Sequence, residues 1–181
     1  MAILIPKRTS VEEVGHFGWL RIDRLGLESD GRAHEAHVIR TIDWVTAVAV
    51  TDDDRFVLVR QHRYGIDAVT LEPAGGIIDP GEPPEVAAVR ELREETGYAG
   101  SRIDALGMVH PNAAMQDNRC WFFLIRGARL VGDLACDENE SVEPVMMSRS
   151  EVEAALESGE ISHALAVIAL MRALARPRQR A

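Results

Sequence analysis

The spacing of hydrophobic residues divides the chain into short strand-like segments and a few helical ones. Apolar residues alternate with polar ones, or β-branched residues dominate, in residues 16–27, 32–42, 45–51, 56–60, 103–109, 120–125 and 145–147. Helical spacing covers residues 84–96, 150–159 and 162–175. Strands on both sides of a helix, with a helical C-terminus, predict an α/β fold: a sandwich on a mixed sheet, with the 84–96 helix packed on one face.

The ends of these helices carry recognisable signals. The 84–96 segment is entered through Pro83 and Pro84, places Val86, Val89 and Leu92 on one apolar stripe, and has Gly97 where a C-cap belongs. A capping box that starts at Ser150 predicts a short helix.

The remaining boundaries follow from glycine and serine. Gly159 ends the helix that starts near Ser150, and Ser162 caps a last helix that runs through Ala175. That last helix is apolar on nearly all sides over residues 164–171. A helix of this kind needs cover on more than one face.

The N-terminal part is predicted to be a separate antiparallel β appendage. Residues 16–27 and 32–42 fit two strands of a hairpin, joined by the polar turn 28–31. We therefore expect a β-rich dimerisation region at 1–43 and the main domain at 44–181. Because exposed strand edges also need cover, these features predict a homodimer.

Composition and charge narrow the class of protein. The 181 residues carry 20 Lys and Arg against 29 Asp and Glu, a net charge of −9. This balance argues against a nucleic acid polymer as partner, although a small anionic substrate can still bind. The longest apolar run, 164–171, is too short to span a membrane, and no signal peptide is recognisable. Cys120 and Cys136 lack metal-ligand spacing, so we expect idle thiols in a reducing, cytoplasmic compartment.

Three carboxylates on the 84–96 helix are the main candidates for chemistry. Glu91, Glu94 and Glu95 are at i, i+3 and i+4, so they crowd one face and repel one another. A hard divalent cation would relieve that repulsion, and magnesium prefers such oxygen ligands. The glycines of the preceding 73–76 loop allow close backbone approach, and a carbonyl there could complete the metal shell. The alternative is a solvated acidic helix face in which Arg90 pairs with Glu94.

The residues from Gly76 to Tyr98 resemble, without a mismatch, the sequence box of the Nudix hydrolases. The matching positions are Gly76, Glu82, Arg90, Glu91, Leu92, Glu94, Glu95, Gly97 and Tyr98. The resemblance implies an α/β/α sandwich and cleavage of a nucleoside diphosphate linked to another group, with Mg²⁺, or alternatively Mn²⁺, as cofactor. It also implies that Glu91, Glu94 and Glu95 bind metal together with the Gly75 carbonyl, that Glu94 and Glu95 are catalytic, and that Glu82 and Arg90 form a structural ion pair.

Segments outside the box resemble the branch that hydrolyses ADP-ribose and nucleoside diphosphate sugars. These segments are RQHRYG at 60–65, LEPAGG at 71–76 and HPN at 110–112. In that branch N-terminal strands are exchanged between two subunits. Arg63 is a candidate clamp for phosphate or sugar, since a guanidinium offers two parallel donors, and Arg60 is a weaker one. The alternative for Arg63 is an exposed arginine at a strand end.

One departure from that branch keeps the substrate open. A proline typical of ADP-ribose enzymes falls at Ala113 here, and Pro111 is two positions earlier. The surrounding segment resembles other sugar-nucleotide hydrolases and offers Asn112, Asn118 and Arg119 as polar candidates for binding substrate. ADP-ribose is therefore one candidate among several.

An acidic segment at 137–143 is the candidate source of a general base. In the resembling branch a glutamate of the corresponding loop contacts metal or positions water, and Glu140 and Glu143 fit that pattern. The alternative is a solvated acidic turn.

The sequence thus predicts a metal-dependent hydrolase that cleaves the diphosphate of a nucleotide sugar such as ADP-ribose. Two other functions remain open: hydrolysis of damaged nucleoside triphosphates, and ligand sensing without catalysis. The retained box carboxylates argue against a sensor. The length of chain before Trp44 argues against the triphosphate enzymes, which tend to be shorter.

Overall fold

The computed structural model describes residues 3–135 and 141–177, which divide into two compact units. One unit combines Met1–Asp43 with His110–Arg119, and the other combines Trp44–Val109 with Cys120–Ala181. Each unit is described by itself below. In the part of the chain that is described, no helix has the length and apolar character needed to cross a membrane.

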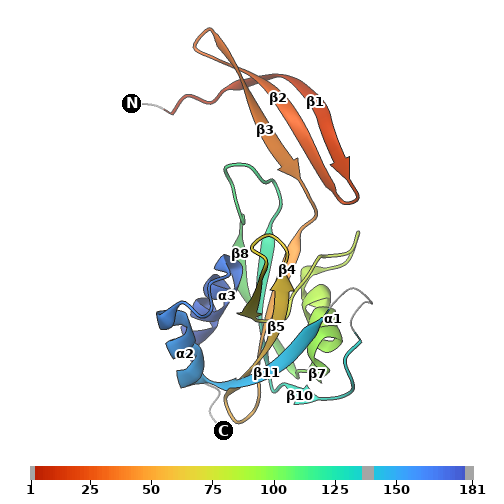
Figure 1. Ribbon diagram of the computed structural model, residues 1–181, viewed down its shortest axis with the longest axis vertical. Helices are drawn as coiled ribbons and strands as arrows, with labels where there is room; N and C mark the ends of the chain where they lie inside the picture. The colour runs from red at the N-terminus through yellow and green to blue at the C-terminus, as the bar shows by residue number, and fades with distance from the viewer. Residues whose placement is uncertain (1–2, 136–140, 178–181) are drawn as a thin grey trace. The chain divides into compact units, whose positions relative to one another are not determined.

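The N-terminal unit contains a three-stranded antiparallel sheet (Figure 1). Its strands are β1 (Lys7–Phe17), β2 (Leu20–Ser29) and β3 (Arg32–Arg40), in the order β1-β2-β3. Asp30 and Gly31, with φ of 51° and 71°, form the turn between β2 and β3, so the expected hairpin at 28–31 is confirmed. The first strand was not expected, because the 16–27 pattern runs through the tight turn at Gly18, where β1 ends and β2 begins.

The second unit is built on a mixed sheet. Its strands are β4 (Trp44–Val50), β5 (Arg55–Arg63), β6 (Ala68–Glu72), β8 (Arg102–Val109), β9 (Cys120–Arg126) and β11 (Val142–Ser148). They follow the order β11-β5-β4-β9-β8, with β6 paired to β5. The pair β4 and β9 is parallel, and the other pairs are antiparallel. A separate two-stranded ladder joins β7 (Tyr98–Ala99) to β10 (Arg129–Leu130).

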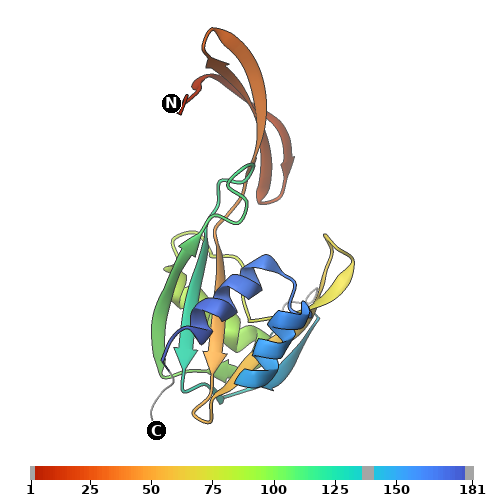
Figure 2. The same ribbon diagram turned by 90° about the vertical axis from the view of Figure 1, so that its left-hand side faces the viewer.

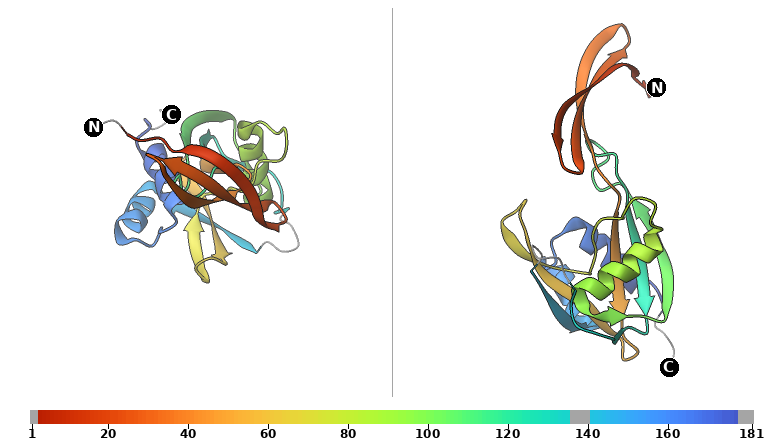
Figure 3. Two further views of the ribbon diagram at one scale, coloured as in Figure 1. Left: turned by 90° about the horizontal axis from the view of Figure 1, so that it is seen from above. Right: turned by 90° about the vertical axis from the view of Figure 1, so that its right-hand side faces the viewer.

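Helices cover both faces of this mixed sheet. Helix α1 (Pro84–Thr96) lies over one face, seen in the right-hand view of Figure 3. Helices α2 (Arg149–Ser158) and α3 (Ala164–Leu174) lie over the opposite face, seen in Figure 2.

Alternation along the strands produces two separate cores. On β4, Val45 and Ala47 pack toward Leu92 of α1, whereas Val48 packs toward Leu170 of α3. The sheet is thus sandwiched between helical layers, and the predicted α/β/α fold with an N-terminal antiparallel β region is confirmed.

The predicted starts of the last two helices were wrong by one or two residues. Helix α2 is capped by Ser148, whose side chain and Glu151 form the capping box, rather than by Ser150. Helix α3 has His163, not Ser162, at its N-cap position. Ser148 lies two residues before Ser150, and His163 lies one residue after Ser162. The spacing of the sequence alone could not show which of these neighbouring residues takes the cap position. The predicted C-caps Gly97 and Gly159 are left-handed, with φ of 72° and 80°.

The expected apolar stripe of α1 was also wrong. Val86 and Val89 are 50% and 41% exposed, while Leu92 is fully buried. The buried face instead contains Ala87, Ala88, Glu91, Leu92, Glu95 and Thr96. The helix is turned so that two of its carboxylates, rather than its valines, face the interior.

Candidate active site

A glycine loop connects the sheet to the carboxylate face of α1. The Gly75 N–H donates to Oε2 of Glu95 at 2.9 Å. On either side, the carbonyls of Ala74 and Gly76 accept from the N–H groups of Ala47 at 2.8 Å and Val45 at 2.9 Å. The backbone contacts on both sides of Gly75 therefore fix the loop against β4, and the N–H of Gly75 points to α1.

Both glycines are required by close contacts. A Cβ on Gly76 would lie 2.5 Å from Oε1 of Glu91, so the carboxylate packs directly on the backbone. A Cβ on Gly75 would collide with the carbonyl oxygen of Val45. The loop thus admits no side chain between β4 and the carboxylates of Glu91 and Glu95.

Arg90 joins the loop to the helix. Its Nε and Nη2 donate to Oε1 and Oε2 of Glu82 at 3.0 and 2.9 Å, and Nη2 also donates to the Ile77 carbonyl at 3.0 Å. The hydrogen bond with Glu82 raises the pKa of Arg90, and the same bond lowers the pKa of Glu82 against the opposing effect of burial. The predicted structural ion pair between Glu82 and Arg90 is confirmed.

The same guanidinium reaches two of the three candidate carboxylates. Nη1 of Arg90 donates to Glu91 Oε1 at 2.8 Å and to Glu94 Oε2 at 3.1 Å. The alternative pairing of Arg90 with Glu94 is therefore present. Glu91 and Glu95 are only 7% and 3% exposed, and carboxylates at that depth are costly unless they are paired or bind a cation.

The donor set has the chemistry of a hard-cation site. Within residues 3–135 and 141–177, no three acidic, His or Cys side chains are grouped tightly enough to hold a metal ion. However, the cationic guanidinium of Arg90 already lies between Glu91 and Glu94, the carboxylates offer oxygen donors, and the glycine loop brings backbone within contact of Glu91. These features fit a magnesium-type ion, which takes carboxylate and carbonyl oxygens.

A cleft of about 750 Å³ borders this site on the outer side of α1. It is lined by Glu85, Val86, Val89, Arg90, Arg93, Glu94, Ile103, Gly132, Asp133 and Ala135. The exposed side chains of Val86 and Val89 form part of the apolar wall of this cleft. Glu94 also lines the cleft and belongs to the group of three candidate carboxylates on α1.

Arg63, the predicted substrate clamp, is held by a buried carboxylate. Its Nε and Nη2 donate to the two oxygens of Glu72 at 2.9 and 2.8 Å. Glu72 also accepts from the hydroxyl of Thr70 and contacts Nδ1 of His163 at 2.6 Å. Sequence reasoning missed Glu72 and His163, since they are 91 residues apart and share no motif.

The candidates Arg60 and Glu143 pair with each other. Glu143 lies opposite Arg60 in the β11–β5 register, and Arg60 Nη1 is 3.8 Å from Glu143 Oε2. Both side chains are largely exposed. They share a strand face with Leu58 and Val145, which pack in the α2–α3 core, while the α1 carboxylates belong to the opposite layer. Glu140 lies outside the described residues.

Two further candidates belong to the N-terminal unit. Asn112 is exposed and forms a turn in which its carbonyl accepts from the N–H groups of Met115 and Gln116. Arg119 binds Asp43 through its side chain, with Nε to Oδ2 at 2.9 Å, and through its own backbone N–H at 2.8 Å. The α1 carboxylates lie in the other unit.

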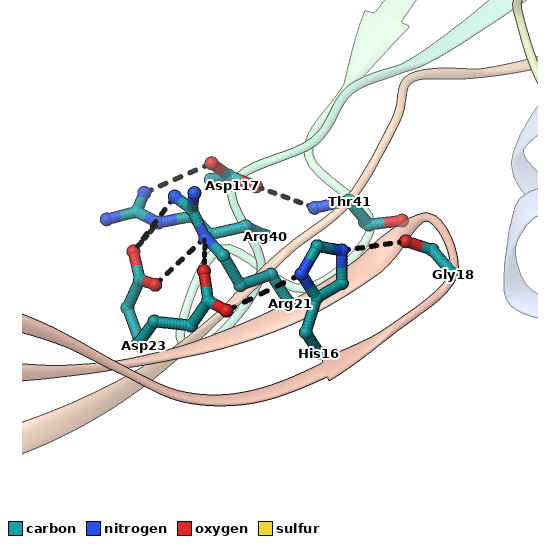
Figure 4. Close-up of polar contacts among 8 residues, drawn as sticks. His16, Gly18, Arg21, Asp23, Arg40, Thr41 and Asp117 are labelled. Atoms are coloured by element: carbon teal, nitrogen blue, oxygen red, sulfur yellow. Dashed lines mark hydrogen bonds and ion pairs between the residues drawn. The ribbon is translucent and has the colours of Figure 1, made fainter.

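A buried aspartate organises the N-terminal unit (Figure 4). Asp23 is 2% exposed and accepts from Arg40 at 2.9 Å and from Arg21 at 3.2 Å. The Arg40 hydrogen bond lowers the pKa of Asp23 despite burial. Arg40 also binds Asp117 at 3.0 Å, and Asp117 accepts from the Thr41 N–H at 3.3 Å. This network ties the 110–119 loop to the end of β3.

Comparison with known proteins shows which family shares these features. The NUDIX domain model matches residues 41–167. The chain is 27% identical over 142 residues to the ADP-ribose pyrophosphatase of Bacillus subtilis (strain 168), covering 78% of this chain and 77% of that protein. It is 31% identical over 144 residues to the CMP-5'-(N-acetyl-N-hydroxy-3-aminopropyl)phosphonate hydrolase of Streptomyces rubellomurinus, covering 80% and 69%.

A solved structure shares the fold. A crystal structure of an ADP compounds hydrolase superposes with a TM-score of 0.85 at 23% identity, covering 96% of this chain and 94% of that one. Since the family model spans more than half of the chain and includes the box helix and its glycine loop, the chain belongs to the Nudix hydrolase family.

Proposed function

We propose that this Nudix hydrolase cleaves the diphosphate bond of a nucleoside diphosphate sugar such as ADP-ribose. The products are a nucleoside monophosphate and a sugar phosphate. The observation that carries the proposal is the pair of buried carboxylates, Glu91 and Glu95, packed against the Gly75–Gly76 backbone with a cationic guanidinium beside them. The similarity to ADP-ribose pyrophosphatases over most of the chain supports the substrate class.

Glu91, Glu94 and Glu95 are proposed to hold Mg²⁺, with Mn²⁺ as the alternative ion, together with the Gly75 carbonyl. When bound, the ion supplies charge neutralisation on the diphosphate and a lowered pKa for the attacking water. Glu94 and Glu95 are the proposed catalytic carboxylates. The contact of the Gly75 N–H with Glu95 supports this set, because it places the Gly75 backbone against one of the proposed carboxylate ligands.

Arg63 is proposed to bind the substrate through phosphate or sugar oxygens. Its bidentate contact with Glu72 uses Nε and Nη2, which fixes the plane of the guanidinium. Arg60, Asn112 and Arg119 remain proposed substrate contacts, and the Asp43 pair would fix the orientation of Arg119. Glu140 or Glu143 is the proposed general base.

A homodimer is the proposed assembly. Strand β1 is exposed along almost its whole length, and Val11, Phe17 and Trp19 of the N-terminal sheet are 52%, 68% and 55% exposed. Apolar side chains on an open sheet edge favour pairing with another chain. A second copy would cover them and could contribute to each substrate site.

The deciding experiment is a substrate screen with resolved phosphate products. ADP-ribose, other nucleoside diphosphate sugars, dinucleoside polyphosphates and nucleoside triphosphates would each be incubated with Mg²⁺ or Mn²⁺. We expect turnover of a diphosphate sugar with release of a nucleoside monophosphate. Release of pyrophosphate from a triphosphate would favour pool cleaning, and binding without turnover would favour a sensing module.

One relative adds a substrate to that screen. The Streptomyces protein is named as a hydrolase of a CMP phosphonate conjugate. A CMP-phosphonate should therefore be included. If the enzyme cleaves it in preference to the sugars, the group linked to the nucleotide is a phosphonate rather than a sugar, and the class of reaction is unchanged.

A further inference from the structure

Glu72 is a deeply buried carboxylate whose hydrogen-bond partners come from β5, β6 and the N-terminal end of α3. It is 2% exposed and ends β6, directly before the glycine loop of the candidate active site. Arg63 of β5 binds both carboxylate oxygens, the Thr70 hydroxyl binds Oε1, and His163 approaches Oε2. A carboxylate with so many donors is fixed in one orientation.

The position of His163 indicates that its side chain serves this cluster. His163 occupies the N-cap of α3 but makes no side-chain capping bond to that helix. Its Nδ1 instead lies 2.6 Å from Oε2 of Glu72. The His163 side chain thus makes no capping contact with its own helix, and it links the N-terminal end of α3 to the end of β6.

The protonation state of the pair follows from the donors. Burial alone would raise the pKa of Glu72, but hydrogen bonds from Arg63, His163 and Thr70 outweigh it and lower the pKa to about 2. An ionised carboxylate only accepts hydrogen bonds, so Nδ1 of His163 must carry the proton.

We propose that Glu72 and His163 are positioning residues for Arg63, which they hold in a fixed plane for the substrate. The proposal rests on the proposed function, in which Arg63 contacts phosphate or sugar oxygens. The Arg63 side chain is 39% exposed, and a long side chain at that exposure would otherwise sample many rotamers. A fixed guanidinium loses less entropy when it binds a ligand.

A purely structural role makes a different prediction. If the cluster only anchors the β5–β6 hairpin, removing His163 weakens folding, and its effects on turnover combine independently with those of Arg63→Ala. If His163 acts through Arg63, the His163→Ala change no longer weakens substrate binding in a protein that already carries Arg63→Ala. A double-mutant cycle separates these roles.

The experiment measures KM and kcat for the best substrate of the screen in wild type, His163→Ala, Arg63→Ala and the double variant. We expect His163→Ala to raise KM roughly three- to tenfold, the range for one newly mobile side chain, with kcat changed less. In the Arg63→Ala background the same change should alter KM by less than about twofold. His163→Asn, which can place an amide N–H near Nδ1, should recover most of the wild-type KM.

Two controls make the result decisive. His62→Ala removes an exposed histidine of β5 that pairs with Asp67, and should leave KM within about twofold of wild type. Equal effects of His163→Ala with and without Arg63 would overturn the positioning role, as would failure of His163→Asn to recover KM while it folds normally. If wild type hydrolyses no substrate of the screen, the proposed function itself fails, which is a separate outcome.

Discussion

Glu95 accepts a hydrogen bond from the Gly75 N–H at 2.9 Å, which joins the last turn of α1 to the loop that follows β6. The contact places a buried carboxylate directly against the backbone of the glycine loop, without any intervening side chain. Most of the candidate site's chemistry depends on this close approach. Substitutions on the helix, at Glu95, and in the loop, at Gly75 and Gly76, test its role.

Changing Glu95 to Gln should remove activity while preserving the fold. Gln retains an oxygen that accepts from Gly75, but it has no charge for a divalent cation. We expect kcat to fall by at least about a hundredfold, the scale of a lost catalytic group, and the metal-free stability to stay equal or rise as repulsion is relieved. Steady-state kinetics and urea unfolding measure the two effects.

The matched control is Glu153→Gln on α2, where the side chain is exposed. It should change kcat by less than about twofold. Near-normal turnover by Glu95→Gln would show that the metal assignment is wrong.

Alanine substitutions at the two loop glycines, Gly75 and Gly76, should affect stability and turnover differently. A Cβ on Gly75 meets backbone atoms of β4, which cannot move aside, so Gly75→Ala should lower the free energy of unfolding by about 1–3 kcal/mol. A Cβ on Gly76 meets the carboxylate of Glu91, a side chain that can shift. Gly76→Ala should therefore lose less stability but weaken Mg²⁺-dependent turnover. If both variants lose stability equally and Gly76→Ala keeps full activity, the close contact with Glu91 has no role in catalysis.

Much of this site follows from the sequence alone. The box spacing predicts that Glu91, Glu94 and Glu95 share a helix, and the resemblance to the Nudix box implies the pair between Glu82 and Arg90. The orientation of α1 does not follow. A stripe of valines predicts a buried face, but tertiary contacts of the glycine loop turn Glu91 and Glu95 inward.

Contacts between distant segments were beyond sequence reasoning. Glu72 and His163 are 91 residues apart, and Arg40 and Asp117 are 77 apart. Each residue alone is an ordinary charged or polar position, and only the fold brings the members of each pair together. Both pairs nevertheless organise segments that carry predicted site residues: Arg63 in the first, and the 110–119 loop with Asn112 in the second.

The low pKa of Glu72 predicts a specific loss of stability in acid. A carboxyl group whose pKa is about 2 when folded and about 4.5 when unfolded stabilises the fold on the order of 3 kcal/mol above pH 5. That contribution declines as the pH falls from about 5 toward 2, because the unfolded state binds the proton first. Unfolding free energies at pH 7, 5 and 3 should therefore fall more steeply for wild type than for Glu72→Gln. Parallel curves for the two proteins would contradict the lowered pKa.

The assembly prediction is tested by hydrodynamics. If the N-terminal sheet pairs with a second copy, sedimentation at micromolar concentration should give about twice the 20.0 kDa mass of one chain. Val11→Asp places a charge on an exposed strand position of β1, so it should shift the equilibrium toward monomer without unfolding the chain. A monomer of wild type under these conditions would remove the dimer and the idea of a site built from two chains.

The acidic segment before and within β11 provides the last test, because a general base and a substrate clamp leave different kinetic traces. If Glu140 or Glu143 positions the attacking water, its change to Gln should lower kcat by about a hundredfold with little change in KM. Arg63→Ala should instead raise KM, since the arginine would contact substrate throughout the reaction. Glu143 pairs with Arg60 at 3.8 Å on the strand face opposite α1, so a surface ion pair is the alternative role for Glu143. If both glutamate variants keep kcat within about twofold, too little for a lost catalytic group, the base must be sought among Glu91, Glu94 and metal-bound water.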